Sequence, residues 1–206
     1  MKTLRLTDCD FAAAAERLGT DVPSLRAVHE VETGSSNGFW APGKPIILFE
    51  GHVFWKQLEQ RGISPAPLAA GNESILYPRW TRRYYGTERE EYARLARALR
   101  IHEEAALMSA SWGMFQIMGF NHKACGFASV HDFVRAMSQS PQAQLLAFVG
   151  FVEQRGLVPF LREHRWGDFA RRYNGPGYVY NRYDLKLREA YERWGGRAGT
   201  MPLAAG

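Results

Sequence analysis

The stretch Leu25–Glu50, LRAVHEVETGSSNGFWAPGKPIILFE, determines how the rest of the chain is interpreted. It begins with an apolar periodicity that predicts a helix ending at Glu32. A polar, glycine-rich loop follows, and the strand-like run KPIILF then ends at a second acid, Glu50. Two carboxyl groups that flank a gap are the minimum apparatus for breaking a glycosidic bond. The stretch therefore predicts an acidic pair at the ends of two neighbouring elements.

Glu32 is the stronger candidate for a catalytic acid. A group that protonates a leaving oxygen near neutral pH needs a raised pKa, which an apolar wall supplies by penalising the charged form. Phe39 and Trp40 in the following loop are candidates for that wall. A solvated charge at a helix end is the alternative interpretation of Glu32, and Glu30, on another face, is expected to be an exposed charge. Glu50 is either a general base or nucleophile, or a charge that stabilises the next helix N-terminus.

Length and composition indicate one ordinary globular domain. The chain has 206 residues, of which 46% are hydrophobic and 23% charged, which excludes disordered and fibrous classes. We predict a single domain over residues 1–206 with a frayed tail at 195–206. The net charge of +5 favours anionic partners, but the sequence has no nucleic-acid-binding motif and we expect no nucleic-acid partner. No signal peptide or membrane span is predicted, so synthesis in a cytoplasm is expected.

Helical periodicity dominates the chain and predicts a mainly α (α+β) fold. Residues 44–49 are the best strand candidate, and a small β-hairpin region is expected near residues 40–50. Residues 62–86 are rich in Pro, Gly, Tyr and Arg and predict a long ordered loop. The predicted helices cover residues 1–20, 25–32, 51–61, 88–110, 130–137, 141–156, 157–164, 167–173 and 181–194.

Other catalytic chemistries find no support in the sequence. His29 and Glu30 begin a zincin-like motif, but Thr33 occupies the position of the second histidine. The sequence contains neither a nucleophile elbow nor a phosphate-binding glycine loop. Cys9 and Cys125 lack metal-ligand spacing and are expected to be reduced thiols. We therefore predict a site with no metal and no cofactor.

Three motifs in order carry a family resemblance: AVHEVETG at 27–34, SWGMFQIMG at 111–119 and RRYNGPG at 171–177. They resemble signatures of the lysozyme-like superfamily, specifically of lytic transglycosylases and goose-type lysozymes. With LFEGH at 48–52, the chain is most similar to the N-acetylmuramidase family of phage endolysins. The resemblance covers about residues 10–195 and implies a lysozyme-like fold.

The resemblance also implies roles for single residues. Glu32 takes the catalytic-acid position, and Gln116 lies in a cleft-lining segment where its amide could bind a sugar. Tyr173 and Asn174 lie where the superfamily holds the catalytic carboxyl or the N-acetyl group of the cleaved sugar, although Tyr173 could equally be part of the core. Ser111 departs from the family pattern and leaves the details of its substrate-binding subsite open.

The function implied is a peptidoglycan hydrolase that cleaves the β-1,4 bond between N-acetylmuramic acid and N-acetylglucosamine. The expected setting is phage-driven host lysis by a monomer made in the host cytoplasm and acting in the periplasm or on the cell wall. One alternative is a lytic transglycosylase that forms 1,6-anhydro products. Another is a cell-wall-binding module without catalysis.

Two segments keep two interpretations each. The aromatic and arginine run Tyr77–Tyr85 either contacts saccharide or envelope, or packs its rings inward. The last helix, Arg182–Trp194, either contacts an outer-membrane surface or buries its Tyr183, Leu187 and Tyr191 face in the core. For this helix we favour burial.

Overall fold

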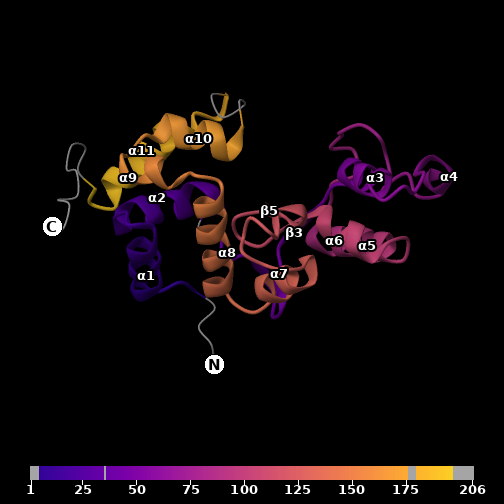
Figure 1. The fold of residues 1–206 in the computed structure, drawn as a ribbon, viewed down its shortest axis with the longest axis horizontal. Helices are drawn as coiled ribbons and strands as arrows, with labels where there is room; N and C mark the ends of the chain where they lie inside the picture. Colours follow the sequence, from indigo (N-terminus) through magenta and orange to yellow (C-terminus); the bar gives the residue numbers. More distant parts are fainter. Residues whose placement is uncertain (1–4, 35, 176–179, 197–206) are drawn as a thin grey trace. The chain divides into compact units, whose positions relative to one another are not determined.

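A computed structural model describes residues 5–34, 36–175 and 180–196 of the chain. It forms two compact units: unit 1 comprises Met1–Asn37 and Phe148–Gly206, and unit 2 comprises Gly38–Ala147. Helices predominate in both, and the described strands are short (Figure 1). The predicted mainly α fold is therefore confirmed. The expected tail at 195–206 lies almost wholly outside the described residues.

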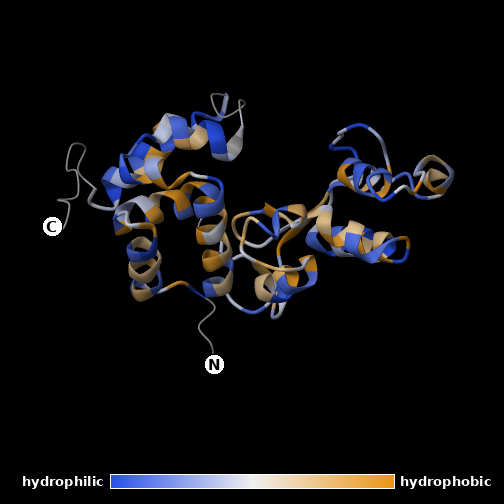
Figure 2. Ribbon diagram, viewed as in Figure 1, coloured by the Kyte–Doolittle hydropathy of each residue, from blue (hydrophilic) through white to orange (hydrophobic). Residues whose placement is uncertain are grey.

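All secondary-structure elements in the described part of unit 1 are helices. The boundary between the units falls inside α8 (Pro141–Gln154), a helix with many apolar residues (Figure 2). The other helices of unit 1 are α1 (Asp8–Leu18), α2 (Val22–Thr33), α9 (Val158–Arg162), α10 (Trp166–Asn174) and α11 (Tyr183–Arg193).

Helix α2 carries Glu32 and begins and ends as its sequence predicts. The Asp21 side chain caps its N-terminus, and Gly34, with φ of 55°, ends it in the left-handed conformation that glycine adopts without steric cost. Leu25 and Val28 are buried on the face that Glu32 continues, four residues after Val28.

A polar contact ties the start of α2 to the end of the chain. Asp21 Oδ2 accepts a hydrogen bond from the Tyr191 hydroxyl at 2.9 Å and lies 3.0 Å from His164 Nε2. Helix α11 packs along α2, with Leu187 and Tyr191 buried. The two core positions Leu187 and Tyr191 agree with the interpretation of α11 as a core helix.

Unit 2 contains two small antiparallel sheets. The first pairs β1 (Phe39–Ala41) with β2 (Lys44–Pro45), and the second has the order β3 (Ile47–Phe49), β4 (Ala110–Trp112), β5 (Ile117–Met118). The hairpin expected near residues 40–50 is present. The single strand predicted over 44–49 is wrong, because Pro45 has no N–H to donate and the chain changes sheet immediately after it.

The remaining elements of unit 2 are helices, and two of the predictions for them are corrected. The helix predicted over 88–110 is two helices, because His102 is extended and its side chain accepts a hydrogen bond from Ala105 N, which starts a new helix. The loop predicted over 62–86 contains one short helix. The helices are α3 (Gly51–Glu59), α4 (Ala66–Ala69), α5 (Glu88–Leu99), α6 (Glu103–Met108), a 3-10 turn, η1 (Gly119–Asn121), and α7 (Val130–Met137).

Gln144 fastens three segments of unit 2 from a fully buried position. Its Oε1 accepts from Met114 N at 2.7 Å, and its Nε2 donates to Met137 O at 2.8 Å and to Gly38 O at 3.3 Å. A Cβ added to Gly113 would lie 2.6 Å from the Gln144 amide, and Gly113 itself has φ of 71°. The glycine of GMFQIM is therefore required both for its backbone conformation and for this close packing.

Among the helices of the described ranges, none combines the length and the apolar character needed to cross a bilayer.

Candidate functional site

Glu32 lies in the last turn of α2 and is half-buried. The Tyr183 hydroxyl, at the start of α11, lies within the electrostatic range of Glu32 in unit 1. Burial raises the pKa of the Tyr183 hydroxyl, and the negative charge of Glu32 raises it further. The ring beside the proposed acid thus comes from the far end of the chain. The wall expected from Phe39 and Trp40 stays a prediction: in unit 2, Trp40 stacks on the ring of Tyr92 at 5.7 Å.

Glu30 has a structural partner, so the expectation of an exposed, solvated charge is wrong. Its carboxylate accepts a hydrogen bond from Trp194 Nε1 at 2.9 Å and forms an ion pair with Arg193. Arg193 is the last residue of α11, and Trp194 is its C-cap. Glu30 therefore links the C-terminal end of α11 to α2.

The backbone around Glu50 is held from both sides by buried side chains of unit 2. Phe49 N donates to the carboxylate of Glu91 at 2.9 Å, and Gly51 N donates to the Tyr77 hydroxyl at 3.2 Å. A Cβ on Gly51 would lie 2.3 Å from the Tyr77 ring, so only glycine permits this approach. The glycine in LFEGH is explained by this contact.

Glu91 is itself paired deep in unit 2. Arg94 Nη1 lies 2.8 Å from the Glu91 carboxylate, and the two side chains are 7% and 2% exposed. Arg94 also donates to Ser74 O at 2.9 Å and to the Tyr77 hydroxyl at 3.3 Å. A buried pair with its remaining hydrogen bonds satisfied is costly to break, which makes the strand before Glu50 rigid.

The two oxygens of the Glu50 carboxylate have different surroundings. Oε1 accepts a hydrogen bond from the Tyr85 hydroxyl at 2.7 Å. Oε2 lies 3.2 Å from His52 Nδ1, but both atoms are buried and neither has a hydrogen-bond partner of good geometry among the described residues. Although Glu50 is the N-cap residue of α3, its side chain makes no capping hydrogen bond. The carboxylate is thus fixed by Tyr85 at one oxygen, while the other oxygen faces His52 without a hydrogen bond of good geometry.

Burial sets the ionisation of both neighbours of Glu50. It lowers the pKa of His52 against the opposing effect of the Glu50 charge, so His52 is neutral at neutral pH. Burial also raises the pKa of Tyr85, and the hydrogen bond to Glu50 raises it further. Tyr85 therefore remains a hydroxyl that can donate to the carboxylate.

Gln116 fixes the β4–β5 hairpin through its amide. Its Oε1 accepts from the Ser111 hydroxyl at 2.7 Å, and its Nε2 donates to Gly113 O at 2.8 Å and to Ile46 O at 3.4 Å. The residue is exposed and has φ of 47°, a left-handed conformation that non-glycine residues rarely adopt. Such strain is found at functional sites. With both amide hydrogens engaged in the hairpin, a sugar would bind Gln116 through its Oε1.

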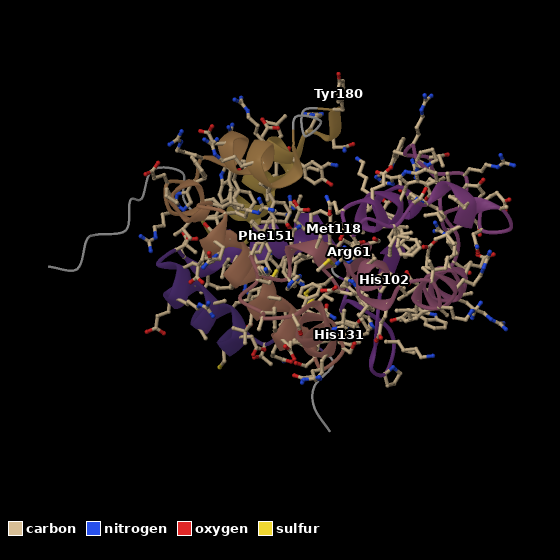
Figure 3. The ribbon with its side chains drawn as sticks, turned by 45° about the vertical axis from the view of Figure 1, so that its right-hand side comes forward. Arg61, His102, Met118, His131, Phe151 and Tyr180 are labelled. Atoms are coloured by element: carbon tan, nitrogen blue, oxygen red, sulfur yellow. The ribbon has the colours of Figure 1, made fainter. Side chains whose placement is uncertain are left out.

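Tyr173 belongs to an aromatic cluster in unit 1. Its ring stacks on Phe169 at 5.5 Å and meets Phe148 and Phe151 edge-on at 5.8 Å (Phe151 is labelled in Figure 3). This packing agrees with the interpretation of its ring as part of the core. The side chain of Asn174, the last residue of α10, lies outside the described residues.

The sequence model of the N-acetylmuramidase family matches residues 21–195. This chain belongs to the N-acetylmuramidase family. The structure is similar to the crystal structure of the Burkholderia AP3 phage endolysin, with a TM-score of 0.86 and 41% sequence identity over 95% of this chain and 73% of the endolysin chain. No curated protein matches the sequence. The predicted family and the predicted enzyme class, a glycoside hydrolase acting on peptidoglycan, are confirmed.

In this muramidase the expected site residues divide between the two units. Unit 1 carries Glu32, Tyr173 and Asn174, and unit 2 carries Phe39, Glu50, Ser111 and Gln116. The structure brings Ser111 and Gln116 into direct contact, while Phe39 is half-buried in β1. The roles assigned to all of these residues stay predictions.

Three neighbours of the two acids were not among the predicted site residues. Tyr183 had been assigned to a core face, and Tyr85 to a loop cluster without a defined partner. His52, two residues after Glu50, belongs to the LFEGH motif but has no predicted role. The signal that could have singled out His52 and Tyr85 was their proximity to the LFEGH motif and to an aromatic run.

Proposed function

We propose that this muramidase hydrolyses the β-1,4 bond between N-acetylmuramic acid and N-acetylglucosamine with Glu32 as general acid and Glu50 as second carboxylate. Glu32 protonates the leaving oxygen. Glu50, directly or through water, stabilises the oxocarbenium-like transition state and activates or replaces the attacking nucleophile. No step of this reaction needs a metal or cofactor.

The observation that carries the proposal is the environment of the Glu50 carboxylate. A side chain that served only the helix N-terminus would bond its amide groups, but Glu50 does not. Instead one oxygen is fixed by Tyr85, and the other is buried 3.2 Å from His52 Nδ1 without a hydrogen bond of good geometry within the described part of the chain. Burying such a group costs free energy, so a buried oxygen left for water or substrate supports a functional role.

The biological setting proposed is host lysis by a phage. The structural relative is named a phage endolysin, and the family acts on peptidoglycan. We propose that the chain is made in the host cytoplasm, acts on the cell wall as a monomer and uses the glycan strands of peptidoglycan as its substrate.

The acid assignment is tested by Glu32→Gln, with Glu30→Gln as the matched control two residues away. Loss of a general acid lowers the rate about 10²- to 10⁴-fold, so Glu32→Gln is expected to clear turbid cell-wall suspensions at least about a hundredfold more slowly. Glu30→Gln removes the contacts with Arg193 and Trp194 and is expected to lower the melting temperature while the activity remains. Wild-type clearing by a folded Glu32→Gln variant would refute the assignment.

The lytic transglycosylase alternative is tested by mass spectrometry of the released fragments. Hydrolysis leaves a reducing N-acetylmuramic acid terminus, whereas the lyase leaves a 1,6-anhydro terminus that lacks one water. We expect reducing ends. Anhydro ends with an active Glu50→Ala variant would instead support a single-glutamate lyase.

A further inference from the structure

The loop before α5 presents a basic and aromatic surface to solvent. This surface, which we call the Trp80 surface, consists of Arg79, Trp80, Arg82 and Arg83, all exposed. Trp80 is 61% exposed, the highest value among the large hydrophobic side chains of unit 2 that are described. Within the described ranges, none of its three arginines forms an ion pair with an acidic side chain.

The tyrosines of the same loop turn inward. Of the two interpretations of Tyr77–Tyr85, inward packing applies to the tyrosines, and an exposed contact surface applies to Trp80 and the arginines. Tyr77 is 8% exposed, and its ring lies 5.2 Å from that of the half-buried Tyr84. Arg83 lies over the outer ring, with its Cζ 5.5 Å from the Tyr84 centroid. The tyrosines thus form a base that supports the exposed indole and guanidinium groups.

The Tyr85 side chain lies between the Trp80 surface and Glu50. Burial raises the pKa of the Tyr85 hydroxyl, and the nearby Trp80 side chain opposes that rise, while the same hydroxyl donates to Glu50 Oε1 at 2.7 Å. The exposed indole therefore lies within two side chains of the proposed second carboxylate, all inside unit 2.

The chemistry of this surface matches one substrate feature. The apolar face of an indole stacks on the C–H face of a pyranose, while guanidinium groups form bidentate bonds to carboxylates. Every N-acetylmuramic acid of an intact glycan can carry a stem peptide with free carboxylates, whereas N-acetylglucosamine carries none. A surface with both groups side by side suits a sugar that bears a peptide.

We propose that the Trp80 surface is a substrate subsite that recognises peptide-bearing sugar units of peptidoglycan. Trp80 stacks on a sugar ring near the bond to be cleaved, and Arg82 and Arg83 bind carboxylates of the attached stem peptide. The inference rests on the proposed function for the nearness of Glu50 to the scissile bond. It adds a specificity that the two catalytic carboxyls alone would not provide: preference for peptide-bearing over peptide-free glycan.

The test compares kcat/KM on intact peptidoglycan and on the same material freed of stem peptides by an amidase. The paired substitution Arg82→Gln/Arg83→Gln is expected to lower kcat/KM on intact peptidoglycan about three- to tenfold and to leave the peptide-free value unchanged, since each exposed ion pair contributes about 0.2–1 kcal/mol. Trp80→Ala is expected to lower both values about tenfold, and Trp80→Phe to retain most of the activity.

Arg100→Gln is the matched control, because Arg100 is an exposed arginine of unit 2 outside the Trp80 surface. It should leave both values unchanged. Unaltered melting temperatures show that each variant is folded. The proposal is overturned if the paired arginine variant changes both substrates equally or neither. It is also overturned if that variant loses only binding to phosphatidylglycerol vesicles, which would assign the arginines to a membrane surface.

Failure of the Glu50 assignment gives a different pattern. If Glu50→Ala is active while the Trp80 and arginine variants show the expected substrate dependence, the subsite is supported and the role of Glu50 is wrong. If Glu50→Ala is inactive and the substrate ratio does not respond to the arginines, the subsite is wrong and the proposed function is unaffected.

Discussion

At the scale of single residues, the two oxygens of the Glu50 carboxyl group have different neighbours. Its hydrogen-bonded oxygen is fixed by Tyr85, and the other oxygen is buried opposite a neutral His52. Protonation of His52 would place a cation beside the carboxylate and reduce its ability to act as a base or nucleophile. The lowered pKa of His52 therefore keeps the Glu50 carboxylate without a full counter-charge over the neutral pH range.

The role of Glu50 is tested by Glu50→Ala with and without sodium azide. If Glu50 is the second carboxylate, the variant is expected to lose at least about a hundredfold in rate, and a small anion that fits the vacated space should restore part of it with a glycosyl azide as product. Tyr85→Phe keeps the carboxylate but removes its hydrogen bond, and is expected to lose about tenfold. Normal activity of a folded Glu50→Ala variant would show that the residue serves α3 alone.

Single-residue predictions from the sequence succeeded where a local pattern fixes the position. Asp21 and Gly34 delimit α2, whose end near Glu32 was predicted, so the placement of Glu32 in its last turn follows from local signals. Tyr183 could not be assigned in this way, because its approach to Glu32 depends on how α11 packs against α2. The hydrogen bond from Tyr85 to Glu50 likewise spans 35 residues and depends on the fold of the intervening loop.

At the scale of elements, the side-chain amide of Gln144 joins three segments of unit 2 by hydrogen bonds to their backbone groups. Gln144→Leu removes its amide and leaves the buried groups Met114 N and Met137 O without their partner. Unsatisfied buried groups cost about 1–3 kcal/mol each, so we expect the free energy of unfolding to fall by about 2–4 kcal/mol, measured by urea titration. Gln154→Leu, an exposed position of the same helix, should change it by less than about 0.5 kcal/mol. Equal effects of the two substitutions would contradict this account.

The contact between α2 and α11 predicts how stability depends on pH. Burial tends to raise the pKa of Asp21, but hydrogen bonds from Ser24, Tyr191 and His164 outweigh burial and lower it. Since the folded pKa lies below the unfolded value of about 3.9, the resulting stability is present above that pH and is lost as the pH falls through the folded pKa.

Urea titrations between about pH 7 and pH 2 measure this contribution. Asp21→Asn is expected to lower the free energy of unfolding by about 1 kcal/mol at neutral pH and to flatten its fall below about pH 4. Glu192→Gln, which removes an exposed charge on α11, serves as the control and should not change the pH dependence of the free energy of unfolding. If the free energy of unfolding of Asp21→Asn fell below about pH 4 as steeply as that of the wild type, Asp21 would not be the source of the pH dependence.

Element boundaries were predictable where a cap residue has one clear preference. The split of residues 88–110 into α5 and α6 was not predictable. Histidine is an uncommon N-cap, and the helical period of the sequence continues across His102. The three-stranded sheet β3-β4-β5 was also missed. Its strands have only two or three residues each, and pairing of Ile47 with Trp112 joins segments that no local pattern connects.

At the scale of the whole molecule, two chain segments form unit 1, and the segment between them forms unit 2. Because α8 is one continuous helix containing the boundary, we propose that the chain unfolds as one cooperative domain, as the sequence analysis expected. Scanning calorimetry should then give one transition, with a ratio of calorimetric to van't Hoff enthalpy of about 1.

Substitutions in either unit provide the control for this prediction. Gln144→Leu in unit 2 and Leu187→Ala in unit 1 should each lower the temperature of the same single transition, since both positions are fully buried. Two separate transitions, each shifted by only one of the substitutions, would show that the units fold independently.

The bond between Asp21 and Tyr191 joins positions 170 residues apart in the chain. During synthesis at about 5–20 residues per second, roughly 10 to 30 seconds pass after Asp21 is made before its partner exists. Helix α2 therefore gains its contacts with α11 only after Tyr183–Arg193 has been made. Fragments that stop before α11 therefore lack its packing on α2, and we expect them to have no lytic activity.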